Sequence, residues 1–209
     1  MLSLREDPLV ELTDYGFLSE PAYFQMGLSS DARCRVRQNV AERLKRARSH
    51  LPAGYNFKIW DGYRTTEVQR ALYESLYKKL EQERPSLKPK ALHAATREFV
   101  SPPTEDPDRA APHNTGGTVD LTVVDEHGRE LPMGTGFDHF EASAHTFHFA
   151  EAPGGSPEAR FHKNRLLLHR ALTALDFYNF PFEWWHYSYG DVHWATHHQK
   201  PPLYRSCEF

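Results

Sequence analysis

Residues 113–124 read HNTGGTVDLTVV, and this pattern predicts a sharp turn followed by a β-strand. The part from Thr118 to Val124 is rich in β-branched side chains, which favour strands. Side chains alternate between the two faces of a strand, so one face here is apolar and contains Val119, Leu121 and Val123. We expect that face to contribute to the hydrophobic core.

The other face of this strand carries a polar side chain, Asp120, between two threonines. Gly116-Gly117 allows the chain to turn sharply just before the strand, and such a turn could bring His113 back over it. One imidazole and one carboxylate would then point at a common position. Taken alone, these residues equally suit a loop histidine and an exposed aspartate beside a turn.

The rest of the sequence predicts an α+β fold. Apolar residues recur at helical spacing in three segments, 36–51, 66–80 and 157–175. Short runs that suit strands occur at 55–60 and 184–187, and residues 192–194 are expected to pair back. We therefore expect a single domain over residues 1–209, with a central antiparallel sheet flanked by helices and a zinc site at the sheet.

Two helix starts and one long loop are also indicated. Thr66 begins a capping box, and Ser156 followed by Pro157 is typical of a helix N-terminus. Segment 85–112 carries six prolines and many charges, which predicts a Pro-rich loop. A short helix around 91–99 is expected to interrupt it.

Composition excludes several classes of protein. The chain has 209 residues and a net charge of −3, whereas proteins that bind nucleic acid or membrane surfaces are normally basic. No apolar stretch approaches the ~20 residues that cross a bilayer. Residues 5–7 are charged where a signal peptide needs an apolar run, so we expect a cytoplasmic protein. Cys34 and Cys207 are expected to be free thiols.

Residues 183–186 read EWWH and suit a hydrolytic zinc centre. Catalytic zinc sites keep three protein ligands and one open position for water. In this interpretation His186 binds the metal, and Glu183 takes a proton from a water whose pKa zinc lowers to about 7. The two tryptophans would exclude bulk water. Alternatively, Glu183 is a carboxylate at a cavity rim and His186 a hydrogen-bonded core histidine.

Residues 60–64 read WDGYR and lie between a predicted strand and a predicted helix. Arg64 could stabilise an anionic tetrahedral intermediate with its forked donors. A surface arginine near a helix start is the alternative.

Together these segments resemble the D-alanyl-D-alanine dipeptidases, a zinc peptidase family best known from vancomycin resistance. The family pattern is a histidine, a glycine three residues later and an aspartate seven residues later, then Glu-Trp-Trp-His, with an upstream Asp-x-Tyr-Arg. Matching residues stand in the same order in this chain: Asp61, Tyr63, Arg64, His113, Gly116, Asp120, Glu183 and His186. Residues 133–138, MGTGFD, are similar to the Met-Gly-Thr-x-Phe-Asp stretch of the dipeptidase branch.

The resemblance implies one zinc ion per chain, held by His113, Asp120 and His186. It also implies Glu183 as the general base and Arg64 as the group that stabilises the transition state.

Two further residues are candidates for substrate binding. Asp138 is the candidate for the ammonium end of a dipeptide, although a carboxylate that fixes the turn is an equal alternative. Tyr63 is the second candidate. The chain departs from the family pattern at Thr65, Ala111 and Thr118, where proline, serine and alanine are usual.

The expected function is hydrolysis of a small dipeptide, most simply D-Ala-D-Ala, by a metalloprotease that acts in cell-wall biogenesis or degradation. One alternative is a D,D- or L,D-carboxypeptidase or endopeptidase acting on muropeptides. Another is a non-catalytic zinc-binding interaction domain. The expected partner is the dipeptide, without nucleic acid or membrane, and the oligomeric state stays open.

Overall fold

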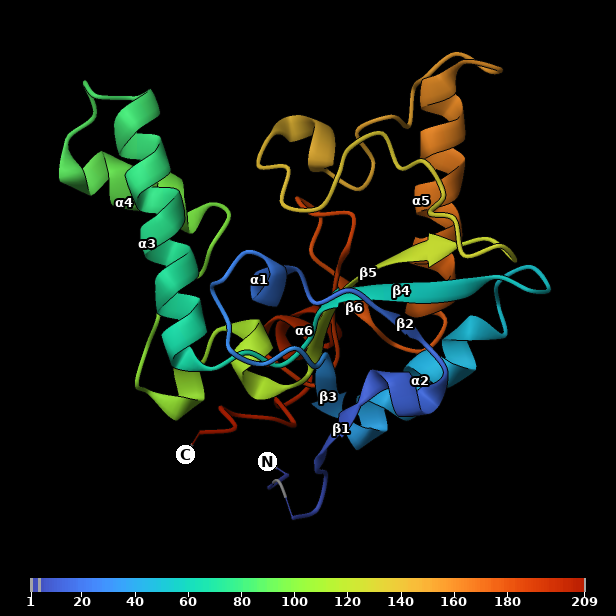
Figure 1. The fold of residues 1–209 in the computed structure, drawn as a ribbon, viewed down its shortest axis with the longest axis horizontal. Helices are drawn as coiled ribbons and strands as arrows, with labels where there is room; N and C mark the ends of the chain where they lie inside the picture. Colours follow the sequence, from blue (N-terminus) through green and yellow to red (C-terminus); the bar gives the residue numbers. More distant parts are fainter. Residues whose placement is uncertain (1, 4, 209) are drawn as a thin grey trace.

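A five-stranded sheet forms the centre of the structure, in the order β2-β4-β5-β7-β6 (Figure 1). The computed structural model describes residues 2–3 and 5–208. The pairs β4-β5, β5-β7 and β7-β6 are antiparallel, and the edge strand β2 pairs with β4 in parallel. The strands of this sheet are β2 (Leu18–Ser19), β4 (Asn56–Asp61), β5 (Thr118–Val124), β6 (Tyr178–Asn179) and β7 (His186–Ser188). The predicted α+β class is confirmed, and the sheet is antiparallel except at that edge.

A second, two-stranded sheet and several helices surround the central sheet. The small sheet pairs β1 (Leu9–Glu11) with β3 (Arg35–Arg37). The α-helices are α1 (Ala22–Gln25), α2 (Gln38–Arg48), α3 (Thr66–Glu83), α4 (Pro89–Arg97), α5 (Pro157–Thr173) and α6 (Val192–His198). Short 3-10 helices are η1 (Leu12–Tyr15), η2 (Pro107–Arg109), η3 (Pro112–Thr115) and η4 (Ala142–Ala144). No helix in the described part of the chain is both long enough and apolar enough to cross a bilayer.

Helix starts agree with the sequence in one case and shift in another. Ser156 caps α5, where its hydroxyl accepts a hydrogen bond from the amide of Ala159 at 3.1 Å. At α3 the cap is Thr65, which accepts from Val68 at 3.2 Å, so the cap lies one residue before the predicted capping residue, Thr66. Adjacent threonines offer the same hydroxyl, and the backbone turn decides between them.

At the C-terminal end, one predicted strand is a helix, and another begins two residues later than predicted. Residues 192–194 form the first turn of α6, because the carboxylate of Asp191 accepts from the amide of Trp194 at 2.8 Å and caps a helix. Trp184 and Trp185 lie in a turn, and β7 begins only at His186. Near the N-terminus, Val36 belongs to β3, and α2 starts two residues later.

One face of the sheet carries the main hydrophobic core. Leu121 lies opposite Ile59, and Val123 lies opposite Phe57, so these side chains share a face. All of them are fully buried. Helices α2 and α5 pack on this core and contact each other. The predicted apolar face of the 118–124 strand is therefore the core face.

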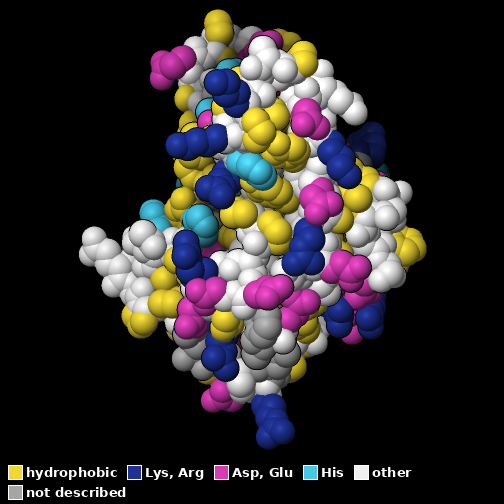
Figure 2. All heavy atoms as spheres, turned by 90° about the vertical axis from the view of Figure 1, so that its left-hand side faces the viewer, with side chains coloured by type: hydrophobic (Ala, Val, Ile, Leu, Met, Phe, Trp, Pro, Cys, Tyr) yellow, Lys and Arg dark blue, Asp and Glu magenta, His cyan; other side chains and the backbone are white. Residues whose placement is uncertain are grey.

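Helices α3 and α4 form a hairpin that projects from the sheet on the side opposite α5 (Figure 1). Its second helix, α4, lies within the predicted Pro-rich segment 85–112 and corresponds to the short helix expected around 91–99. A second cluster of buried side chains holds it, formed by Tyr23, Val68, Leu72, Tyr73, Leu76, Leu80, Leu92 and Val100. Figure 2 views this side, where hydrophobic side chains gather between charged ones.

A buried polar network ties both ends of the chain to the 112–115 segment. The Tyr204 hydroxyl donates to Asp7 Oδ2 at 2.6 Å, and the Asn39 amide donates to Asp7 Oδ1 at 3.0 Å. Arg37 lies over the Tyr204 ring and donates from Nε to the carbonyl of Thr115 at 2.9 Å. This network stabilises the segment that leads into β5.

Replacing Tyr204 by phenylalanine removes one hydrogen bond to a buried carboxylate. A bond to a charged group contributes roughly 1.5–3 kcal/mol, so we expect Tyr204→Phe to lower the free energy of unfolding by that amount. Equilibrium urea unfolding measures it. Tyr77→Phe, at a half-buried position of α3, is the control and should change stability by about 0.5 kcal/mol or less. Equal effects of both substitutions would contradict the assignment.

Candidate metal centre and active-site cavity

Three polar residues lie side by side across the central sheet. Asp61 on β4 pairs with Asp120 on β5, and Asp120 pairs with His186 on β7. Directly opposite residues in an antiparallel pair place their side chains on the same face. The row therefore lies on the face opposite the main core.

A β-bulge creates this row at the end of β4. Ile59 pairs with Leu121 and Asp61 with Asp120, so two residues of β4, Trp60 and Asp61, stand opposite one residue of β5. A bulge of this kind turns the following side chain toward the other face and is common beside active sites. It moves Asp61 to the polar face.

His113 reaches the row from η3. Gly116 ends η3 with φ of 70° and turns the chain into β5. A Cβ at this position would lie 2.6 Å from Leu9 Cδ2, so both the left-handed backbone and the close packing require glycine. The turn places the His113 ring beside Asp120, as the sequence predicts.

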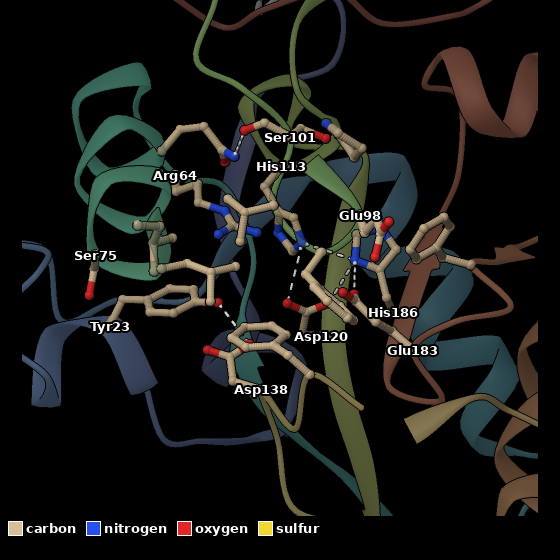
Figure 3. A pocket seen from close by; sticks show the side chains of 18 of the residues that line it. Tyr23, Arg64, Ser75, Glu98, Ser101, His113, Asp120, Asp138, Glu183 and His186 are labelled. Carbon is tan, nitrogen blue, oxygen red and sulfur yellow. Dashed lines mark hydrogen bonds and ion pairs between the residues drawn. The ribbon is translucent and has the colours of Figure 1, made fainter. Parts of the chain in front are cut away.

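His113, Asp120 and His186 form a buried cluster that could hold a metal ion (Figure 3). One candidate ligand atom from each residue lies within 4.8 Å of the others. Asp120 Oδ2 lies 3.3 Å from His113 Nε2, and Asp120 Oδ1 lies 3.0 Å from His186 Nδ1. No further group of this kind occurs among the described residues.

The second ring nitrogen of His113, Nδ1, is fixed by two contacts outside the cluster. Nδ1 donates to the carbonyl of Gly62 at 2.7 Å and lies 3.0 Å from Asp61 Oδ2. A carbonyl can only accept, so Nδ1 carries a proton and Nε2 faces the cluster, as a neutral, metal-binding histidine requires. Partners of this kind orient a metal-binding histidine and raise its basicity.

Electrostatics within the cluster favour an ionised Asp120. Burial raises the pKa of Asp120, but the nearby His113 and His186 outweigh burial and hold it below the ordinary value. Burial lowers the pKa of His113, yet Asp120 and Asp61 outweigh it and raise the pKa to about 9. Burial lowers the pKa of His186. The donor set is thus two imidazoles and one carboxylate, the nitrogen and oxygen ligands that zinc takes.

Glu183 stands next to the cluster because the backbone turns before β7. The amide of His186 donates to the Glu183 carbonyl at 3.3 Å, which closes the turn. The side-chain amide of Asn179 donates to the carbonyl of Glu183 at 3.1 Å and to the carbonyl of His186 at 3.0 Å. Residues three apart on a regular strand point to opposite faces, and this turn instead brings Glu183 Oε2 within 3.6 Å of His186 Nδ1. Burial, followed by Asp120 and Asp138, raises the pKa of Glu183 well above its ordinary value.

Arg64 provides a buried positive charge at the same cavity. Its Nε lies 3.2 Å from Asp61 Oδ2, and its guanidinium lies 5.0 Å from the centre of the Tyr23 ring. Burial would lower the pKa of Arg64, but Asp61 outweighs it, so the group stays charged. The Asn114 side chain donates to the Arg64 carbonyl at 2.7 Å and fixes this corner to η3.

Asp138 faces the cavity from the 133–138 loop. The Tyr23 hydroxyl donates to Asp138 Oδ1 at 3.3 Å (Figure 3). Burial, together with Asp120, raises the pKa of Asp138 to about 7. Sequence reasoning did not identify Tyr23, because it lies in a four-residue helix without periodicity.

The 133–138 loop is itself fixed by buried contacts. Arg165 of α5 donates to the carbonyl of Met133 at 2.8 Å, and Thr135 accepts from the Trp184 indole at 2.8 Å. Gly134 has φ of 89°, and a Cβ there would lie 2.5 Å from the Phe149 ring. The loop therefore holds Asp138 in one place.

These residues line one cavity of about 460 Å³. Arg64, His113, Asp120, Asp138, Glu183 and His186 all contribute to its wall. His193, which the sequence analysis left out of the site, lines it as well. Tyr63 does not: its ring lies near Arg35 and borders a separate, smaller cavity.

Replacing Asp61 by asparagine tests its role behind His113. Loss of such a partner usually lowers metal affinity about tenfold to a hundredfold, and we expect this for Asp61→Asn. Competition with a chromogenic chelator measures zinc affinity. Asp125→Asn, which removes a carboxylate bound to Arg129 beyond β5, is the matched control and should leave affinity unchanged. An unchanged affinity in Asp61→Asn would mean that the Gly62 carbonyl alone orients His113.

Comparison with known proteins gives a consistent set of relatives. A D-alanyl-D-alanine dipeptidase of Synechocystis is 26% identical over 206 residues, which cover 90% of this chain and 83% of the relative. A D-alanyl-D-alanine dipeptidase of Escherichia coli is 41% identical over 75 residues, 36% of each chain. A vancomycin-resistance D,D-pentapeptidase, solved in complex with Zn(II), aligns over 84% of both chains with a TM-score of 0.47 and 18% identity.

The family model described as D-ala-D-ala dipeptidase matches residues 25–202. This range contains the bulge, the metal-site cluster, Glu183 and the 133–138 loop. Because the match covers most of the sequence, the chain belongs to the D-Ala-D-Ala dipeptidase family of peptidases.

Proposed function

We propose that this chain hydrolyses a small dipeptide, most simply D-Ala-D-Ala, at a zinc ion held by His113, Asp120 and His186. In this proposal residues 1–209 act as one peptidase domain. The observation that carries it is the convergence of three buried ligand atoms beside Glu183, in a cavity that Asp138 also lines. The names of the two dipeptidase relatives support the substrate.

The donor set fits a catalytic zinc site. Two imidazole nitrogens and one carboxylate make three protein ligands, which is the number that leaves a coordination position open. When bound, zinc supplies a Lewis acid that polarises a carbonyl oxygen and lowers the pKa of a water to about 7. Gly62 and Asp61 keep the His113 lone pair aimed at the ligand position.

Glu183 moves the proton. Its carboxylate takes a proton from the water whose oxygen bonds to the carbonyl carbon of the peptide. When the C–N bond breaks, Glu183 returns that proton to the leaving amine, so the products are two amino acids. Burial beside other carboxylates raises the pKa of Glu183, which makes it a stronger proton acceptor.

Arg64 stabilises the negative charge that develops on the carbonyl oxygen. Asp61 holds the guanidinium at 3.2 Å, so the donor is oriented before substrate binds. Burial removes competing water and strengthens the interaction.

Asp138 and Tyr23 recognise the free ammonium of the dipeptide. The half-buried Asp138 carboxylate accepts a hydrogen bond from the Tyr23 phenol, and the nearby Arg64 only partly offsets the effect of burial on its pKa. An ammonium beside it would favour the ionised form and lower the pKa of Asp138 from about 7. Recognition of a free amine separates a dipeptidase from a carboxypeptidase that takes longer peptides.

Glu183→Gln and His186→Ala separate the proton carrier from a ligand. We expect Glu183→Gln to keep zinc and to lose roughly a hundredfold to ten-thousandfold in turnover, the usual contribution of a general base. His186→Ala should lose both zinc and activity. Zinc content by atomic emission and release of D-alanine measure the two effects. His193→Ala is a control for zinc content, because His193 lines the cavity outside the cluster.

Near-normal turnover of zinc-loaded Glu183→Gln would remove Glu183 from the mechanism. A wild-type protein that binds zinc and hydrolyses neither dipeptides nor muropeptides would instead favour the non-catalytic interaction domain.

Acetylation of the substrate amine tests the ammonium site. The acetylated peptide leaves Asp138 without a charged partner, so we expect D-Ala-D-Ala to be hydrolysed at least about a hundredfold faster than its N-acetyl form. Steady-state kcat/KM for both peptides measures this ratio. Asp138→Asn should shrink it, mainly by slowing hydrolysis of the free dipeptide. Equal hydrolysis of both peptides by the wild-type enzyme would favour the D,D-carboxypeptidase alternative.

A further inference from the structure

The cavity extends well beyond the catalytic cluster. Its volume of about 460 Å³ lies in the range of sites that hold drug-sized ligands, whereas the side chains of D-Ala-D-Ala are two methyl groups. The additional space is bordered by apolar residues of the second hydrophobic cluster. We call this space the apolar annex and define it by Leu28, Leu72, Leu76, Val100 and Phe140.

The side chains that border the annex are packed in place. Leu72 and Leu76 come from one face of α3 and are nearly fully buried, as is Val100. Phe140 packs against Phe99 with ring centres 5.3 Å apart. Leu72 and Leu76 come from α3 and the other annex residues from three further segments, and all of them pack in one cluster, so the space does not depend on a single residue.

The annex begins at the ammonium end of the catalytic site. Tyr23 belongs to the second cluster together with Leu72 and Leu76, and its hydroxyl donates to Asp138. Figure 3 shows Ser75 of α3 beyond Tyr23, on the side away from Asp120 and His186. Tyr23 and Asp138 thus lie between the metal-site cluster and the annex.

We propose that the apolar annex binds a large apolar side chain on the first residue of the dipeptide, the residue that carries the free amine. This inference rests on the proposed function. The amine bound at Asp138 and the carbonyl bound at the metal-site cluster fix two of the three groups on that residue's α-carbon. The third group, its side chain, is then the part nearest the annex.

Charge also favours an apolar occupant. The charged residues that border the cavity beyond the catalytic cluster are all exposed to water: Lys79, Arg97 and Glu98. A charged substrate group in the annex would lose its hydration without a buried partner, which is costly. An apolar side chain gains from burial there, and one methylene in such a pocket changes the rate about tenfold or more.

Two isomeric dipeptides provide the test. D-Leu-D-Ala and D-Ala-D-Leu have the same composition and differ in which residue carries the large side chain. We expect kcat/KM for D-Leu-D-Ala to exceed that for D-Ala-D-Leu about tenfold or more. The L-isomers are assayed in parallel, and the comparison is made in the series that the enzyme hydrolyses. Calorimetric titration of the metal-free protein with both peptides gives the same comparison without turnover.

A substitution on α3 links the preference to the annex. Ser75 is exposed, lines the cavity and precedes Leu76. Ser75→Phe should fill the annex from its wall and abolish the difference between the two isomers, in kcat/KM and in binding. Glu74→Phe adds the same ring at an exposed neighbour that does not border the cavity, and it should keep the wild-type ratio. Thermal unfolding of both variants checks that they fold.

The outcomes separate this inference from the proposed function. Hydrolysis of both isomers with equal kcat/KM, or a preference that Ser75→Phe leaves intact, overturns the annex and leaves the dipeptidase in place. Tighter binding of D-Leu-D-Ala to the metal-free protein without hydrolysis by the zinc-loaded protein supports the annex and overturns the proposed function. Absence of both binding and hydrolysis overturns both.

Discussion

The pairing of β4, β5 and β7 is the constraint on which the site depends. Asp61, Asp120 and His186 share one face only because β4 bulges at Trp60 while β5 and β7 pair in register. A slip of one residue between two strands would move a side chain to the opposite face, into the main core. That core resists a slip, because Leu121 and Val123 are fully buried on the other face. Hydrophobic burial on one side of the sheet therefore fixes the geometry of ionisable groups on the other.

Charge is the second constraint, and it acts against stability. Asp61, Asp120, Asp138 and Glu183 are four acidic groups in or beside one buried space, and Arg64 is the permanent cation among them. Burial and mutual repulsion raise the pKa of Glu183 and Asp138, which means that the fold disfavours their ionised forms. A divalent cation at the cluster and a substrate ammonium near Asp138 would both relieve this repulsion. Ligands of this charge would therefore lower the unfavourable electrostatic energy of these buried carboxylates.

The sequence predicted local structure best where one physical signal dominates. Strand β5 alternates strictly, and Ser156-Pro157 caps a helix, and both elements occur at the expected residues. The prediction of a strand at 192–194 was wrong because a short apolar run suits either a strand or a helix. The carboxylate of Asp191 caps the segment and favours the helix. For the site, the spacing of motifs in the sequence indicated His113, Asp120, Glu183 and His186 as candidate residues. The contact of Tyr23 with Asp138 joins residues 115 positions apart and leaves no local signal.

The two hydrophobic clusters support different parts of the site. The main core positions the metal-site residues through the sheet, whereas the second cluster shapes the cavity beyond Asp138. Phe137 packs against both: its ring lies 5.1 Å from Trp60 of β4 and 5.8 Å from Tyr23. The residue next to it is Asp138, held with a left-handed backbone at φ of 56°. Phe137 thus joins the two clusters, whereas the annex residues Leu72 and Leu76 belong to α3, outside the central sheet. In the proposed mechanism, the chemistry of the cluster depends on the sheet, the choice of substrate side chain depends on the second cluster, and Asp138 lies between them.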